Sequence, residues 1–201
     1  MTFPTPPGTP TRPDTPPARP PDDPREDRGA WLYRQLLDRR IVLAQGTLDD
    51  RLATVLCAQL LTLDAEGDDP IQLHLNTPDG ELGAALTVLD AVDVLRVPVR
   101  AVATGAVGGP ALAVLVAAGE RISYPHATFH LVEPRTQTEG TATEVAAHEA
   151  NHRALANDFY ARIAQVTGRD VEQVRADARK GTFFTAEQAV AYGLVEKVAP
   201  R

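Results

Sequence analysis

Apolar residues follow two alternating patterns along residues 31–198, and this alternation is typical of an α/β fold. Short apolar runs suit buried strands, whereas segments with apolar residues every three to four positions suit one face of a helix. Strands are predicted at 41–44, 71–75, 97–103, 121–124, 128–132 and 195–198. Helices are predicted at 31–37, 49–66, 82–92, 111–118, 143–166, 170–179 and 185–193. Asp49 is predicted to cap the start of 49–66, Gly168 to end 143–166, and Thr185 with Gln188 to form a capping box that opens 185–193. We therefore expect a mostly parallel sheet wrapped by helices, with the long helix 143–166 projecting from it.

The stretch 102–119 predicts a buried strand, a glycine turn and a buried helix. Gly105, Gly108 and Gly109 allow positive φ and close backbone approach, and Pro110 fits a first helical position. Such strand–turn–helix units often carry a nucleophile and point backbone amides at an oxyanion. This turn contains neither serine nor cysteine. The sequence therefore predicts the geometry of such a site without its nucleophile.

Composition excludes several classes of function. The chain has 201 residues, with Asp+Glu 27 against Lys+Arg 20 and a net charge of -7, so we expect no nucleic-acid partner. Its single cysteine, Cys57, excludes an internal disulfide and is predicted to be an inert core thiol. We see no long apolar run and no secretory signal pattern. We therefore expect no membrane association and a cytoplasmic protein.

The first 28 residues are rich in proline and lack apolar periodicity. Such composition predicts a disordered segment, because it cannot bury enough apolar surface to fold. A propeptide or a segment that gates a pore is the alternative. We expect residues 29–201 to form a single domain.

Five stretches in residues 31–198 resemble the proteolytic subunit of the Clp protease, a member of the Clp/crotonase fold. They read LLDRRI (36–41), NTPDG (76–80), GAVGGPALAVLVAAG (105–119), PHATFHLVEP (125–134) and FFTAEQAVAYGLV (183–195). The resemblance implies a ββα superhelix and two stacked rings joined by a handle, here helix 143–166. It also implies a Ser-His-Asp triad and an ATP-driven AAA+ unfoldase that feeds the rings.

All three implied triad positions carry other residues. The serine position falls at Gly109, counted from Gly105, or at Pro110, counted back from Gly119. The histidine position is Val132 and the aspartate position is Gly181. We therefore predict no catalytic residue.

Two further parts of the implied site also depart from the family. The expected oxyanion amides are Gly80 and the Pro110–Ala111 turn, but Asp79 replaces a family glycine and would oppose an oxyanion. Gln72 and His74 replace the aromatic residues that dock the unfoldase, so docking of that partner is doubtful.

Other residues could in principle supply chemistry. Ser123, the only serine, and Thr104 are predicted to be structural, and His130 is a displaced base only if a nucleophile exists. His148-Glu149-Ala150-Asn151-His152 has the H-E-x-x-H spacing of a zinc site, with Glu172 as a conceivable third ligand. We favour a place near a subunit interface for His148 and His152, together with Leu155 and Phe159. No metal and no cofactor are predicted.

The leading hypothesis is a non-catalytic Clp-type subunit that forms rings alone or with an active paralogue. The stripe Leu155, Phe159, Ile163 and Val166 is predicted to need a partner surface, which indicates an oligomer. The alternatives are an active serine endopeptidase with a different triad, or a crotonase-like enzyme acting on an acyl-thioester.

Overall fold

The computed structural model describes residues 28–200. The chain divides into two units, Met1–Gln35 and Leu36–Arg201. Helix α1 (Arg28–Leu37) contains the described part of the first unit. The proline-rich segment predicted at 1–28 lies outside the described residues apart from Arg28, where α1 begins.

A seven-stranded, mostly parallel sheet organises the second unit. The hydrogen-bonded order is β1-β2-β3-β4-β7, and β5 adds to β3 while β6 pairs with β5. All these pairs are parallel except β5 with β6. The bounds are β1 Ile41–Gln45, β2 Ile71–Thr77, β3 Val99–Gly108, β4 Glu120–Ser123, β5 Thr128–Leu131, β6 Thr182–Thr185 and β7 Lys197–Val198. The predicted α/β class is confirmed.

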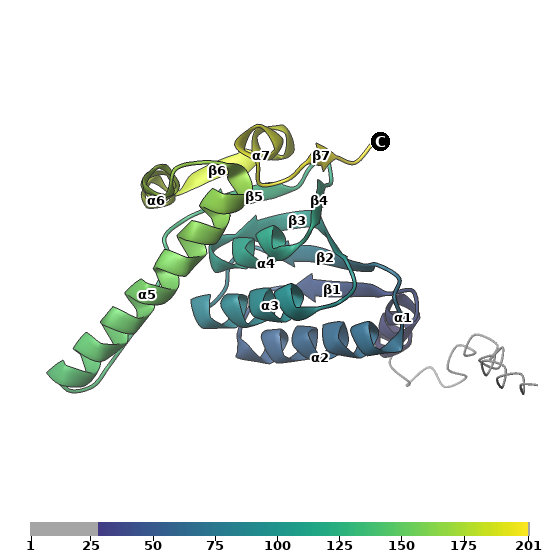
Figure 1. The fold of residues 1–201 in the computed structure, drawn as a ribbon, viewed down its shortest axis with the longest axis horizontal. Helices are drawn as coiled ribbons and strands as arrows, with labels where there is room; N and C mark the ends of the chain where they lie inside the picture. Colours follow the sequence, from purple (N-terminus) through teal and green to yellow (C-terminus); the bar gives the residue numbers. More distant parts are fainter. Residues whose placement is uncertain (1–27, 201) are drawn as a thin grey trace, which may run out of the picture. The chain divides into compact units, whose positions relative to one another are not determined.

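Helices α2 (Asp50–Glu66), α3 (Leu82–Val94) and α4 (Leu112–Ala117) lie along one face of the sheet (Figure 1). Their apolar sides bury against alternate residues of the strands, such as Ile71, Leu73 and Leu75 of β2. The predicted N-cap of α2 is confirmed, because the Asp49 side chain accepts a hydrogen bond from the Leu52 amide. In the part of the chain that the model describes, no helix is both long and apolar enough to cross a bilayer.

The central strand is longer than its sequence predicts. β3 runs through Gly105 and Gly108, and only Gly109 has a positive φ among the three glycines of the predicted turn. The short 3₁₀ helix η1 (Gly109–Ala111) follows and leads into the buried helix α4. Gly108 is needed for a different reason: a Cβ there would collide with the carbonyl oxygen of Pro78. The turn is thus a single glycine between two close-packed elements.

Helix α5 (Ala142–Thr167) is the predicted projecting helix (Figure 1). Thr141 and Glu144 form a capping box at its start, and the predicted C-cap Gly168 ends it in the left-handed conformation. Its buried residues, Phe159, Tyr160, Ile163 and Ala164, all belong to its second half. The first half is almost entirely exposed.

The last elements close one end of the sheet. They are α6 (Val171–Lys180), strand β6, α7 (Ala186–Tyr192) and β7. The predicted capping box of Thr185 with Gln188 is present, and Gly193 ends α7. Strand β6 was not predicted. It exists because Phe183 and Phe184 pair with His130 and Phe129 of β5 in an antiparallel ladder.

Candidate functional site at the end of the central strand

Gly109 lies in the turn after β3 and, with Pro110, is one of the two positions at which the resemblance implies a nucleophile. Its φ of +53 is in the left-handed region, which residues with a Cβ rarely adopt. A Cβ built on Gly109 would lie 2.6 Å from Asp79 Oδ1 and 3.8 Å from Val132 Cγ1. The first two implied triad positions are therefore neighbours in space, and the volume where a serine side chain would begin is already taken.

The segment Asp79-Gly80 is fixed against Leu48. The Leu48 amide donates to the carbonyl oxygen of Asp79 at 3.0 Å, and the Glu81 amide donates to that of Leu48 at 2.8 Å. A Cβ on Gly80 would lie 2.8 Å from the Leu48 Cβ, so this close approach requires glycine. The Gly80 amide itself donates to Asp79 Oδ1 at 2.9 Å. The amide that we predicted to stabilise an oxyanion thus already has an anionic partner.

Gly181, the third implied position, lies against His130. It ends α6 with a φ of +63, and a Cβ there would lie 3.5 Å from His130 Nε2. The His130 ring stacks on Phe183 with a centroid separation of 3.8 Å and an interplanar angle of 4°. His130 and Val132 belong to the same segment at the end of β5. The structure therefore brings all three implied positions to one end of the sheet.

Opposite charges flank this site. Arg135 Nη2 lies 3.9 Å from Asp79 Oδ2, with both side chains well exposed. Burial lowers the pKa of His130, while the Asp79 carboxylate acts in the opposite direction and the Arg135 guanidinium lowers that pKa further. His130 therefore favours the neutral imidazole and responds to the charges of both Asp79 and Arg135.

The other candidate nucleophiles are engaged elsewhere. Ser123 is 0% exposed, and its hydroxyl donates to the carbonyl oxygen of Tyr124 at 2.9 Å. The Thr104 hydroxyl donates to the carbonyl oxygen of Leu75 at 3.1 Å. Cys57 is half-buried on α2, where burial raises the pKa of its thiol. The geometry of all three is that of structural side chains.

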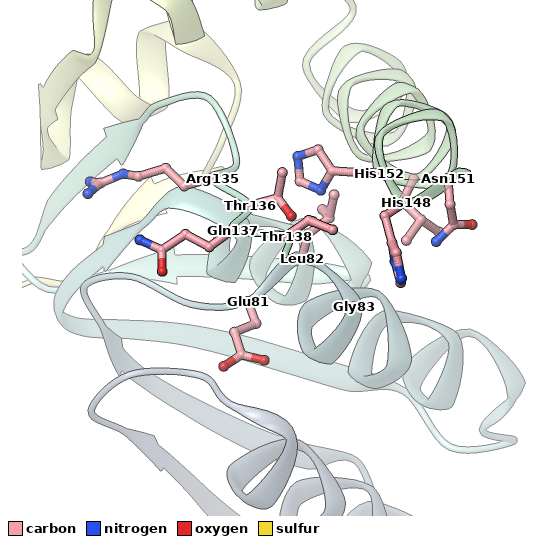
Figure 2. A pocket seen from close by; sticks show the side chains of 11 residues that line it. Glu81, Leu82, Gly83, Arg135, Thr136, Gln137, Thr138, His148, Asn151 and His152 are labelled. Carbon is pink, nitrogen blue, oxygen red and sulfur yellow. The ribbon is translucent and has the colours of Figure 1, made fainter. Parts of the chain in front are cut away.

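A cavity of about 570 Å³ adjoins the site between α5, the start of α3 and the segment 135–138 (Figure 2). His148, Asn151, His152 and Leu155 of α5 line it. The His152 Nε2 lies 3.2 Å from the carbonyl oxygen of Pro134, which connects α5 to the segment after β5. His148 is exposed and His152 is half-buried.

The predicted interface stripe of α5 needs correction. Phe159 is 0% exposed and Ile163 is equally buried, so both belong to the core of this chain. Leu155 and Val166 are partly buried and pack against that core. The stripe is covered by the chain's own helices α3, α4 and α6, because its residues lie in the second half of α5. It therefore carries no argument for an oligomer, and Phe159 is unavailable to a partner.

Within residues 28–200, no three side chains of His, Cys, Asp or Glu gather closely enough to hold a metal ion. His148, Glu149 and Glu172 do not form such a group with His152. Glu149 instead pairs with Arg153 on the surface of α5, at 2.6 Å.

Sequence reasoning missed two residues of the site, Arg135 and Phe183. The resemblance places the histidine position two residues before a proline, which is Pro134 here, and Arg135 is the next residue. Its position in the sequence could therefore have indicated that it lies near the site. The stacking of Phe183 on His130 depends on the antiparallel β5–β6 pairing, which the apolar pattern did not predict.

The fold defines an α/β protein with a mostly parallel sheet, and the positions at which the resemblance implies a triad lie at one end of that sheet. A family model described as Clp protease matches residues 24–201. The chain belongs to the Clp protease family and is a homologue of its proteolytic subunit. Members of this family form oligomeric rings, which fits the predicted Clp-type oligomer.

Proposed function

We propose that this chain is a non-catalytic ring subunit of a Clp-type assembly, with a structural or regulatory role. The observation that carries the proposal is that none of the three implied triad positions has a side chain that can relay a proton. Gly109 lies beside Val132, and Gly181 lies beside His130, two residues before Val132. Gly109, Val132 and Gly181 have no ionisable or nucleophilic group. Serine-type catalysis needs a nucleophile and a base in contact. A subunit without these side chains can still form part of a ring.

The geometry favours Gly109 over Pro110 as the serine position, because the Cβ position of Gly109 faces Val132. The residue after Gly109 is then Pro110, which has no amide hydrogen. The Pro110–Ala111 turn therefore loses the donor that would follow a nucleophile. This loss weakens the crotonase-like alternative as well, since that chemistry also needs two oxyanion donors.

Partners follow from the same proposal. The chain forms rings alone or with an active Clp-type subunit, in the cytoplasm. Docking of an unfoldase is weakened, because Gln72 and His74 stand at the strand positions where the resemblance implies aromatic side chains. His148 and His152, in the exposed first half of α5, remain the candidate contacts to a second ring.

The test combines a fluorophosphonate probe with a short fluorogenic peptide, applied to the purified chain and to its mixture with an active Clp-type subunit. We expect no labelling of this chain, no turnover by it alone, and one mixed assembly by native mass spectrometry. The peptidase alternative requires Ser123 to react despite its burial. Labelling at Ser123 with turnover that Ser123→Ala abolishes would overturn the proposal.

A further inference from the structure

The Asp79 carboxylate lies between the Gly80 amide and the turn at Gly109. Its Oδ1 atom accepts from the Gly80 amide at 2.9 Å. The same atom lies 2.6 Å from the place where a Cβ on Gly109 would stand. One oxygen therefore occupies both the hydrogen-bond position of the amide and the space beside the reacting position.

The surrounding residues favour this position of the Asp79 side chain. Gly109 has no side chain, so the volume in front of the turn is free for Asp79. Gly80 is locked against Leu48, which keeps its amide in place. Arg135 is 3.9 Å from the other carboxylate oxygen, but both side chains are exposed, so this pair adds little. The Gly80 amide is the contact that positions Asp79.

We propose that Asp79 is an internal ligand of the oxyanion-type site, occupying the Gly80 amide and excluding external carboxylates or carbonyl oxygens. The inference rests on the proposed function only in taking Gly80 as the amide that faces the reacting position. Pro110 has no amide hydrogen, so Gly80 is the donor that remains of the two predicted oxyanion donors. Loss of the triad and occupation of this donor are two separate blocks on the site.

The proposal predicts what happens when the carboxylate is removed or displaced. Asp79→Ala deletes the acceptor and leaves the Gly80 amide free to bind a small carboxylate. Asp79→Asn removes the charge but keeps a side-chain oxygen that can accept from Gly80, so it is the matched control. Gly109→Ala puts a methyl group 2.6 Å from Oδ1, which is too close and should push Asp79 off the amide while leaving the carboxylate in the protein.

The measurement is ¹H–¹⁵N NMR of the Gly80 amide in the full chain, with circular dichroism to check folding. In Asp79→Ala and in Gly109→Ala we expect amide exchange with water to be about fivefold faster than in wild type, the protection expected from one hydrogen bond. Added sodium acetate, matched in ionic strength by sodium chloride, should shift the Gly80 resonance saturably in Asp79→Ala. It should leave wild type and Asp79→Asn unchanged.

Three results would overturn the inference. Gly80 exchange that is equally fast in wild type and both variants would show that Asp79 does not hold the amide. An acetate-induced shift of the same size in wild type would show that the site is open. A freed Gly80 amide that ignores acetate would show that no anion is being excluded. These readouts do not involve peptidase activity, so probe labelling of the chain would overturn the proposed function alone.

Discussion

Gly109 and Asp79 are complementary, because the side chain that one residue lacks leaves the space that the other fills. The sequence already showed a carboxylate beside a predicted oxyanion amide. The structure adds that this carboxylate accepts from that amide and lies against the missing Cβ. A substitution at either position should therefore depend on the residue at the other.

A serine at position 109 should not restore activity and should destabilise the fold. Gly109→Ser places a Cβ in the left-handed region and 2.6 Å from Asp79 Oδ1. The backbone strain costs about 1–3 kcal/mol. Asp79→Gly removes the clash and should recover part of the lost stability. Urea unfolding of both single variants and the double variant would measure this recovery.

Strict additivity of the two substitutions would contradict the contact between Asp79 and position 109. Neither variant should react with a fluorophosphonate, because Val132 and Gly181 still provide no base. We expect restoration of all three triad side chains also to fail while Asp79 remains, because Asp79 would still accept from the Gly80 amide and crowd position 109.

His130 should make the stability of the chain depend on pH near neutrality. Burial lowers the pKa of His130, and it also lowers that of His74 on β2. The unfolded chain then binds more protons below about pH 6.5 than the folded chain does. The contribution of the two histidines to the free energy of unfolding is therefore complete above about pH 6.5 and declines as the pH falls through that value.

Urea unfolding at about pH 7.5 and pH 5.5 tests this, since most carboxyl groups titrate lower, near pH 4. We expect a lower free energy of unfolding at the lower pH. His130→Phe keeps a ring that can stack on Phe183 and should reduce the difference, and adding His74→Gln should reduce it further. A difference that is unchanged in the double variant would contradict the assignment.

Helix ends were predicted most directly from the sequence. Asp49 and Thr185 cap helices by accepting hydrogen bonds from amides three residues further along the chain, so the signal is local. Strand β6 was missed because it depends on pairing with a distant strand. The α5 stripe was assigned to a partner because apolar spacing indicates that a face is covered without indicating what covers it.

The two capping boxes offer a comparison between an exposed helix end and a packed one. Thr141→Ala removes the cap of α5, whose first half is exposed, whereas Thr185→Ala removes the cap of α7, which packs into the core. Each cap is worth about 1 kcal/mol. We expect Thr185→Ala to lower the global free energy of unfolding by about that amount.

Thr141→Ala should instead fray the first turns of α5 with little effect on global stability, because few tertiary contacts depend on them. Hydrogen exchange of residues 142–150 would show the local loss of protection. An equal global effect of the two substitutions would mean that the first half of α5 is coupled to the core.

The site as a whole could be predicted only in part. The positions Gly109, Val132 and Gly181 followed from the resemblance, and the structure places Gly109 beside Val132 and Gly181 beside His130. The hydrogen bond from Gly80 to Asp79 and the stacking of His130 on Phe183 could not be predicted, because both depend on side-chain conformations set by tertiary packing. These two contacts show that side chains of the chain itself occupy the site, which the sequence did not predict.

At the scale of the whole molecule, membership of a ring-forming family and the exposed first half of α5 both support assembly. This half carries alanines such as Ala147 and Ala154, which lie on one face two turns apart and are exposed. In the proposed ring subunit this half of the helix meets a partner subunit. The buried stripe of Phe159 and Ile163 anchors the other half.

Charge on that face should therefore weaken assembly without unfolding the chain. Ala147→Glu combined with Ala154→Glu places two carboxylates at a packed contact, whereas the same positions in an isolated chain are exposed and should change stability by no more than about 0.5 kcal/mol. Sedimentation velocity of the chain, alone and with an active Clp-type subunit, should show a smaller assembly for this variant. The matched Ala147→Gln/Ala154→Gln variant, similar in size but uncharged, should assemble more fully. Assemblies of equal mass for wild type and both variants would remove the first half of α5 from the interface, and a wild-type chain that stays monomeric even with the active subunit would end the ring proposal.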